Sequence, residues 1–214
     1  MTTGPVDVEL SDDPRAAVRE RIVRGARVEL TRRGLAVRVE DVAAAAGVSR
    51  RTVFRYFETR DSLVAAALED SMRSYGDRVP RPEPDVELDE WLRTALVAIH
   101  HMNAQHGRVY FELASGADLD GPLGDIARRR RAARAELVHR FTATAWRLTG
   151  ADDDPPRWLV DTVAVLLSAF ATEALVPDFG RTPDEVGTSM AIALAHAVRG
   201  AADEQRAADA TAGS

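Results

Sequence analysis

The 214-residue chain contains no cysteine, which excludes disulfide bonds, thiolate metal sites and cysteine nucleophiles. It contains no lysine either, so all 28 basic residues are arginine. The N-terminal residues lack the basic start and apolar run of a secretory signal. The most apolar stretch, Thr162–Thr172, is shorter than the roughly 20 residues that cross a membrane. We therefore expect a cytoplasmic protein without a membrane partner.

Catalytic motifs are also missing. The sequence has no glycine-rich phosphate loop, no Gly-x-Ser-x-Gly elbow and no His-Glu-x-x-His pair. No two of His100, His101 and His106 are four residues apart, the spacing that places two metal ligands on one helix face. The aspartates at 152–154 precede a predicted helix, where they suit its positive end. We expect no metal, no cofactor and no enzymatic activity.

Aromatic residues make up only 6% of the chain, and few segments alternate as strands do. Alanine, leucine, arginine and glutamate favour helix, so the sequence predicts an all-α protein of about nine helices. The net charge of −6 is unevenly distributed. Residues 15–60 hold twelve arginines against five acidic residues, whereas the rest of the chain holds sixteen against twenty-nine. A basic module joined to an acidic body is typical of a protein that binds DNA at one end.

The basic module contains two short predicted helices with a tight turn between them. Apolar residues at three- and four-residue steps from Val39 to Ala46 share one helix face. Gly47 suits the left-handed residue that ends a helix, and Ser49 can cap the next helix, Arg50–Phe57. A helix, a turn with glycine and a second helix that begins with arginines form a helix-turn-helix pattern. The second helix of such a motif reads the DNA major groove.

These residues resemble the N-terminal domain of the tetracycline-repressor (TetR) family of bacterial transcription regulators. The resemblance covers roughly residues 15–70 and is carried by Ala43, by Gly47-Val48-Ser49 and by the run Thr52–Phe57. It implies an N-terminal three-helix DNA-binding domain, a C-terminal helical domain for ligand binding and dimerisation, and double-stranded operator DNA as a partner.

The resemblance also implies roles for individual residues. Arg50, Arg51 and Thr52 would contact bases or phosphates, and Tyr56 and Arg60 would hold the phosphate backbone. Arginine suits base contact because its fork can donate twice to guanine.

Two positions depart from the family pattern. Phe54 stands where the family often has tyrosine, which removes a hydroxyl that would bind phosphate. Arg38 stands where the family often has a threonine that caps the helix, and arginine has no oxygen to act as a cap. We hypothesise that Arg38 reaches a phosphate instead. The full predicted DNA-binding set is Arg38, Ser49, Arg50, Arg51, Thr52, Arg55, Tyr56 and Arg60.

The sequence predicts a disordered arm at 1–13 and a flexible tail at 201–214. Between them, the resemblance implies a helix-turn-helix domain at 14–60 and a helical effector-binding and dimerisation domain at 61–200. In this last domain, Gly107 is predicted to end a helix that begins at Leu88, before a short helix Val109–Ala114. A long helix follows at Pro122–Leu148. The arginine run at 128–131 within it points around more than one face, so we expect these side chains to be solvated or salt-bridged.

The last two predicted helices begin at Asp154-Pro155 and at Thr182-Pro183, and both are strongly apolar. Apolar stripes of this size either fold into the chain's own core or pack against a partner. The resemblance names the partner as a second copy, joined through a four-helix bundle. A two-fold dimer also reads two DNA half-sites. The predicted dimer interface is Trp158, Val163, Leu166, Leu167, Val186, Met190, Ala193, Leu194 and Ala197.

The resemblance further implies a small-molecule effector, often hydrophobic, in the C-terminal domain. Ligand pockets are mostly apolar with a few polar groups, although aromatic residues at helical spacing are more often core. The predicted ligand-binding residues are Trp91, His100, Met102, Tyr110, Phe111, Phe141, Trp146 and Phe170.

The sequence thus predicts a homodimeric repressor that binds a palindromic operator and is released by a small apolar effector. Two alternatives remain open: a helical enzyme without recognisable motifs, and a ligand-binding scaffold without DNA-binding activity.

Overall fold

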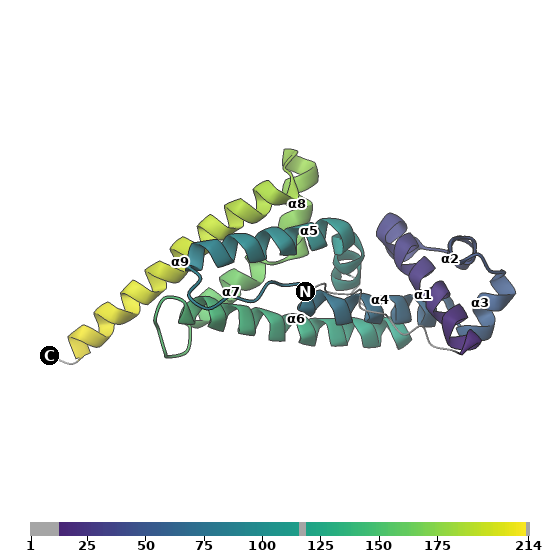
Figure 1. Ribbon diagram of the computed structural model, residues 1–214, viewed down its shortest axis with the longest axis horizontal. Coiled ribbons are helices and arrows are strands. Elements are labelled where there is room, and N and C mark those ends of the chain that lie inside the picture. Colours follow the sequence, from purple (N-terminus) through teal and green to yellow (C-terminus); the bar gives the residue numbers. More distant parts are fainter. Residues whose placement is uncertain (1–12, 116–118, 213–214) are drawn as a thin grey trace, which may run out of the picture. The chain divides into compact units, whose positions relative to one another are not determined.

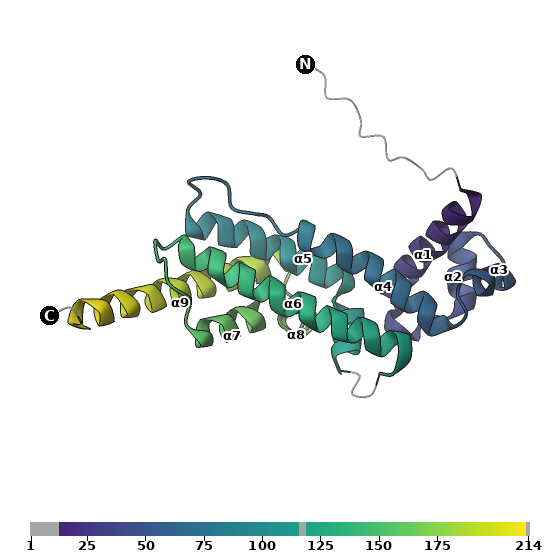
Figure 2. The same ribbon diagram turned by 90° about the horizontal axis from the view of Figure 1, so that it is seen from below.

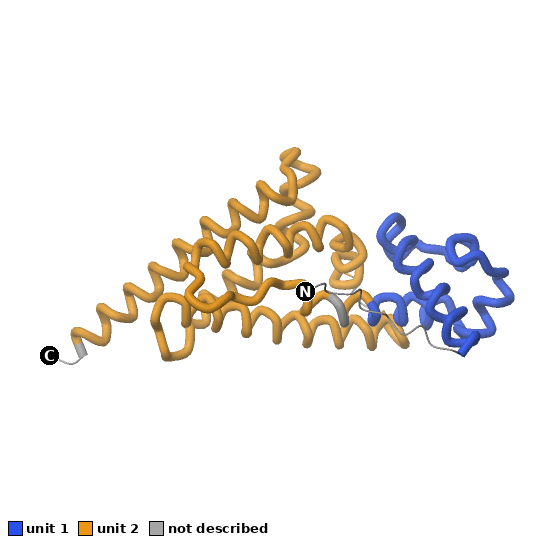
Figure 3. Tube along the Cα trace, viewed as in Figure 1, with its two compact units in different colours: residues 1–70 blue, residues 71–214 orange. Residues whose placement is uncertain are grey.

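The chain forms two compact units, residues 1–70 and 71–214 (Figure 3). The computed structural model describes residues 13–115 and 119–212, and every regular element within these ranges is a helix. The prediction of an all-α protein is therefore confirmed. The units divide at residue 70, whereas the sequence analysis placed the boundary at residue 60. Of the predicted arm at 1–13, only Asp13 lies within the described residues.

Unit 1 consists of α1 (Pro14–Arg33), a 3-10 turn η1 (Gly34–Ala36), α2 (Val39–Ala46), α3 (Arg50–Tyr56) and the first part of α4 (Arg60–Asp77) (Figure 1). Each α-helix contributes to one apolar core, which includes the buried side chains of Ile22, Val42, Val53 and Leu63. α2 packs against α1, and α3 packs against α2. Both short helices keep exposed residues on their other faces.

The approach of α2 to α1 depends on Gly25. A Cβ atom at this position would lie 3.1 Å from the backbone nitrogen of Ala46 and 3.3 Å from the carbonyl oxygen of Val42. Glycine therefore lets the backbone of α1 pass close to α2, which holds the first helix of the helix-turn-helix in place.

Unit 2 consists of the remainder of α4, then α5 (Leu88–Ser115), α6 (Gly121–Arg147), α7 (Arg157–Leu166), α8 (Ala169–Phe179) and α9 (Pro183–Ala212) (Figures 1 and 2). α5 packs along α9 and against α8, and α6 packs against α7 and α5. Trp91 of α5 stacks on Phe141 of α6 with ring centroids 4.6 Å apart. At Gly187 of α9, a Cβ atom would lie 2.5 Å from the Cα atom of Val97, so α5 and α9 meet almost backbone to backbone.

One predicted helix end is wrong, because α5 continues through Gly107 to Ser115. The segment predicted as a separate helix at 109–114 is its last part. A Cβ atom at Gly107 would lie 3.3 Å from Oε1 of Glu173 and 3.4 Å from Cβ of Ala169. This glycine therefore accommodates the neighbouring α8 and does not end the helix, a role that depends on a residue more than sixty positions away.

The helix predicted from Asp154 is two helices. α7 begins at Arg157 and ends at Leu166, and α8 begins at Ala169. The hydroxyl of Ser168 donates to the carbonyl of Val165 at 2.6 Å and accepts from the amide of Ala171 at 3.3 Å, so it caps α8. At this break, the Ser168 side chain thus makes hydrogen bonds to backbone groups that a continuous helix would pair with each other.

The start of α9 is as predicted: the Glu185 amide donates to the Thr182 hydroxyl at 3.3 Å, and the Thr182 amide donates to the Glu185 carboxylate at 2.8 Å. The prediction of a flexible tail from residue 201 differs from the structure, since α9 extends to Ala212. Ala201 and Ala202 are buried, which ties the helix to the core beyond Gly200.

Within the described ranges, no single helix is long and apolar enough to cross a membrane. Only α7 and α8 taken together, with a 45° bend between them, reach that length and composition. Both helices contribute buried side chains, including Leu159, Val163 and Ala169.

Candidate nucleic-acid interface and ligand cavity

The turn between α2 and α3 has the geometry that its sequence predicts. Gly47 adopts a left-handed conformation with φ of 65°, and the amide of Val48 donates to the carbonyl of Ala43 at 3.0 Å. The hydroxyl of Ser49 accepts a hydrogen bond from the amide of Thr52 at 3.0 Å, so Ser49 caps α3. Its oxygen also lies 2.9 Å from the hydroxyl of Thr52. Both polar side chains at the start of α3 therefore help to form the turn.

The outer face of α3 carries the exposed arginines of the motif. Val53 and, just beyond the helix, Phe57 are buried, which fixes the opposite face towards solvent. Arg51 and Arg55 are exposed. The guanidinium of Arg55 lies over the ring of Tyr56, 5.4 Å from its centroid. In the part of the chain that the structure describes, no acidic side chain pairs with Arg51 or Arg55.

Arg50 differs from these two arginines because it already has partners within unit 1. Its Nε lies 3.0 Å from Oε1 of Glu40, in a pair whose side chains are both more than half exposed. Its guanidinium also lies over the ring of Phe54, 5.2 Å from the centroid. Phe54, which stands where the family often has tyrosine, thus contacts Arg50 through the face of its ring.

Arg60 is held within the fold. Its Nε donates to the carbonyl of Val37 at 2.9 Å, a second nitrogen donates to the carbonyl of Leu35, and a third pairs with Asp61 at 2.8 Å. These contacts fix the connection between α1 and α2. To hold a phosphate, as predicted, the guanidinium of Arg60 would have to share or give up these three contacts.

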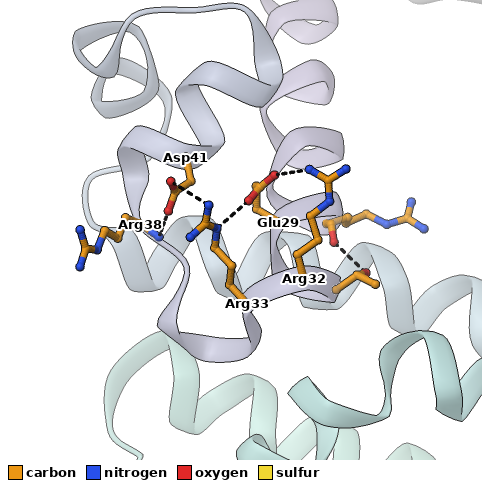
Figure 4. A network of polar contacts seen from close by, with 7 residues as sticks. Glu29, Arg32, Arg33, Arg38 and Asp41 are labelled. Atoms are coloured by element: carbon orange, nitrogen blue, oxygen red, sulfur yellow. Dashed lines mark hydrogen bonds and ion pairs between the residues drawn. The ribbon is translucent and has the colours of Figure 1, made fainter.

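A polar network joins the end of α1 to the start of α2 (Figure 4). The carboxylate of Glu29 is buried and accepts from Arg32 at 3.2 Å and from Arg33 at 2.9 Å. Arg33 also lies 3.5 Å from Asp41, whose other oxygen accepts from the backbone amide of Arg38 at 3.3 Å. Asp41 therefore makes one half of a capping box, the bond from the backbone amide of residue 38, whereas the Arg38 side chain has no oxygen to accept the other bond, from the backbone amide of Asp41. The Arg38 side chain itself is exposed.

Unit 2 contains a cavity of about 230 Å³ between α4, α5, α6 and the start of α8. Of the eight predicted ligand-binding residues, only Tyr110 lines it. Four side chains lie instead in the hydrophobic core: Trp91, Met102, Phe141 and Trp146. Phe111 and Phe170 are exposed, with ring centroids 4.8 Å apart.

His100, the remaining predicted ligand residue, is completely buried away from this cavity. Its Nδ1 lies 2.8 Å from the Thr172 hydroxyl, and its Nε2 has no hydrogen-bond partner among the described residues. Burial lowers the pKa of His100 to about 4, so the ring is neutral near pH 7.

The sequence analysis did not identify the polar lining of the cavity, which includes Tyr75, Asn103, Arg130 and Arg134. The Tyr75 hydroxyl donates to Oδ1 of Asn103 at 3.1 Å. The guanidinium of Arg130 lies over the ring of Tyr110, 4.8 Å from its centroid. Arg130 belongs to the run that was expected to be solvated or salt-bridged. Its neighbour Arg128 is exposed and pairs with Asp125, as expected.

The residues predicted for a dimer interface separate into two groups in the structure. Four are buried in the chain itself: Val163, Leu167, Val186 and Leu194. For these four, the core of unit 2 accounts for the apolar character that suggested an interface. The others are exposed or half-buried: Trp158, Leu166, Met190, Ala193 and Ala197. Large apolar side chains that the sequence analysis did not select, Val165, Phe179 and Ile192, are exposed on α7, α8 and α9.

Within residues 13–115 and 119–212, no group of three or more His, Cys, Asp or Glu side chains has the geometry to hold a metal ion.

Comparisons with known proteins match both the motif and the fold. Residues 22–67 match the family described as bacterial regulatory proteins, tetR family, whereas no curated protein sequence matches the chain. A tetR-family transcriptional regulator from Streptomyces coelicolor has a similar structure, with a TM-score of 0.70 and 22% identity over 90% of this chain and 86% of that one.

Two similar structures were solved with ligands. FadR from Bacillus subtilis, in complex with stearoyl-CoA, has a TM-score of 0.62 and 12% identity over 82% of this chain and 97% of that one. AibR, in complex with isovaleryl coenzyme A and operator DNA, has a TM-score of 0.59 and 15% identity over 81% and 96%. At these identities the likeness concerns the fold. Residues 22–67 thus resemble the tetR family of bacterial regulatory proteins, and the fold of the chain is similar to that of a tetR-family transcriptional regulator.

Proposed function

We propose that this protein is a transcriptional repressor that binds a palindromic operator as a homodimer and is released by a small effector. The observation that carries the proposal is the outer face of α3, where Arg51 is exposed beside a buried Val53 and pairs with no acid in the described part of the chain. A basic, unpaired side chain at the start of the second helix suits contact with DNA in the major groove.

The remaining arginines of unit 1 support the same interface. The Arg38 side chain is exposed and forms no ion pair within the described residues, so it can reach a phosphate. Arg50, in an exposed pair with Glu40, can exchange that carboxylate for phosphate at little cost, because exposed ion pairs are weak. AibR, a protein of similar fold, was solved with operator DNA.

Exposed apolar side chains support a dimer. Trp158 and Val165 of α7, Phe179 of α8 and Ile192 of α9 are between 46% and 70% exposed. We propose that a second copy of the chain covers these side chains. The same interface would include Ala193 and the half-buried Leu166, Met190 and Ala197. Two-fold symmetry then places two copies of α3 on two half-sites, which explains the expected palindrome.

Repression follows if the dimer covers a promoter. An effector in the cavity of unit 2 releases DNA if it binds one conformation of the protein better than another. Complexes of FadR and AibR with coenzyme A thioesters show that two proteins of this fold bind small molecules. We place this regulation in the cytoplasm, where bacterial DNA is accessible.

The first experiment selects fragments of the encoding genome on purified protein and measures affinity for the enriched sequence at several salt concentrations. We expect a near-palindromic sequence whose affinity falls steeply with salt, because each phosphate contact contributes about 0.9 to the slope. Enrichment of no sequence over unrelated DNA would reject the proposal. Light scattering on the free protein and a footprint of the complex test the dimer.

Arg51→Ala should lower affinity for the selected operator at least about fivefold, since a lost base contact costs about 1–3 kcal/mol. Arg147→Ala is the matched control. Arg147 is exposed near the end of α6 in unit 2, so the variant removes the same charge outside the helix-turn-helix unit. Equal losses for both variants would mean that net charge, and not contact by α3, determines binding.

A further inference from the structure

The cavity of unit 2 is lined by a half-buried positive charge that no carboxylate of the described residues pairs with. Arg130 of α6 lines the cavity and is half-buried. Its contact there is the face of the Tyr110 ring, and no carboxylate pairs with it in the described residues. Burial lowers the pKa of Arg130, yet a guanidinium stays protonated in proteins. A charge in this position is costly unless an anion accompanies it.

Neighbouring side chains add to the imbalance. Arg134 is one helical turn from Arg130, lines the same cavity and donates to the backbone carbonyl of Ala164. Like charges four residues apart on a helix destabilise each other. Glu136 is the acidic residue of the lining, but it pairs with Arg140 at 3.0 Å. Burial raises the pKa of Tyr75, so its hydroxyl remains neutral and supplies no negative charge.

The rest of the lining is apolar and the space is small. Leu137 and Val138 of α6, Leu167, and Ala169 at the start of α8 form apolar walls. The volume of about 230 Å³ is below the 300–1,000 Å³ of pockets that hold drug-sized ligands. Such a space suits a small organic molecule and not a whole coenzyme A thioester. Guanidinium forks match carboxylates in bidentate geometry.

We propose that this cavity binds a small organic carboxylate, whose anionic group pairs with Arg130 and Arg134 while its apolar body lies against Leu137 and Leu167. The proposal rests on the proposed function, because it names the chemical class of the effector. The sequence predicted a small apolar effector. The proposed effector is instead a small molecule that is apolar except for one carboxylate group.

The test measures binding to the full-length protein without DNA, by calorimetry and thermal unfolding. The probes are benzoate, phenylacetate, 3-methylbutanoate and hexanoate, each paired with its uncharged amide, and inorganic phosphate alone. We expect at least one carboxylate at ten times its Kd to raise Tm by about 3 °C or more, whereas its amide does not. Stabilisation by no carboxylate, by amides equally well, or by phosphate alone would overturn the proposal.

Variants locate the site. Arg130→Gln should weaken binding of the active carboxylate at least about tenfold, whereas Arg131→Gln should change it less than about twofold. Arg131 is the next residue of the same helix, is exposed and does not line the cavity. Without ligand, the Tm of Arg130→Gln should equal or exceed that of the wild type, because the unpaired charge is gone. A lower Tm, or equal weakening by both variants, would mean that Arg130 is structural.

Operator binding is measured separately, so the two proposals can fail independently. Specific DNA binding without carboxylate binding would remove the ligand assignment and leave the regulator. Carboxylate binding without specific DNA binding would leave the cavity assignment and remove the regulator.

Discussion

The two units treat buried polar groups differently. In unit 1, the buried carboxylate of Glu29 accepts hydrogen bonds from both Arg32 and Arg33. In unit 2, Arg130 lines the cavity and pairs with no carboxylate of the described residues, and Nε2 of His100 is buried without a hydrogen-bond partner among them. The buried carboxylate of unit 1 thus has its hydrogen-bond partners, whereas unit 2 retains polar groups that lack such partners and whose burial is costly.

This difference fits the two proposed tasks. A domain that reads DNA needs a fixed shape and free charges outside it, and unit 1 has its exposed arginines on α3 and at Arg38. A domain that responds to a ligand gains affinity if the ligand relieves an unfavourable state of the free protein. Uncompensated groups are therefore expected to concentrate in unit 2. The following predictions test this contrast.

The largest effect concerns the pH dependence of unit 2. The pKa of His100 is about 4 in the folded protein because of burial and about 6.5 in an unfolded chain. Below pH 6.5 the unfolded state takes up a proton that the folded state does not bind. Stability therefore falls as the pH is lowered from about 6.5 to about 4, by about 3 kcal/mol over the whole window. Denaturant unfolding at pH 7 and pH 4.5 measures most of it.

His100→Asn should remove this part of the pH dependence, because asparagine does not titrate and can still bond the hydroxyl of Thr172. His139→Asn is the control, since His139 is exposed on α6. Carboxylates that titrate in the same window affect all three proteins equally. If wild type and His100→Asn lose the same stability between the two pH values, buried His100 is not an uncompensated group.

The next effect concerns Glu29 in unit 1. Glu29→Gln replaces one acceptor oxygen with an NH₂ group that faces an arginine donor, so we expect a loss of about 2 kcal/mol in the free energy of unfolding. Glu20→Gln is the matched control on the same helix. Glu20 pairs with Arg24 at 2.8 Å, also four residues away, but both side chains are exposed. Its loss should stay below about 0.5 kcal/mol.

Denaturant unfolding compares the two variants directly. Similar losses would show that burial of Glu29 adds nothing to its ion pairs, and the contrast between the units would then disappear.

The sequence predicted unit 1 well because its determining contacts are short in sequence. Gly47 ends α2 and Ser49 bonds Thr52 three residues later, so turn, cap and helix start can be identified from neighbouring residues. Arg60 is an exception. Its partners Leu35 and Val37 lie more than twenty residues away, and no local pattern distinguishes an arginine that holds a loop from one that holds a phosphate.

Unit 2 shows the opposite case. Arg128 and Arg130 belong to one run and look equivalent in the sequence, yet one pairs with Asp125 at the surface and the other lines the cavity. What separates them is the position of Tyr110 on another helix. The same holds for Gly107, whose neighbour Ala169 comes from α8. The helices of unit 2 could be predicted from periodicity, but the cavity depends on how distant helices meet.

The smallest effect concerns the one arginine of α3 that is already paired. Glu40→Gln should raise affinity for the selected operator about two- to threefold more than Glu58→Gln does, because the exposed pair between Glu40 and Arg50 costs about 0.5 kcal/mol to break. Glu58 is exposed in the same unit, so both variants remove one negative charge near DNA and differ in whether Arg50 is released. Titrations at several salt concentrations measure the difference, and the salt slope should steepen for Glu40→Gln if Arg50 then binds a phosphate. Equal gains would mean that Arg50 stays within the fold like Arg60, and that the free charges of unit 1 are those of Arg38, Arg51 and Arg55.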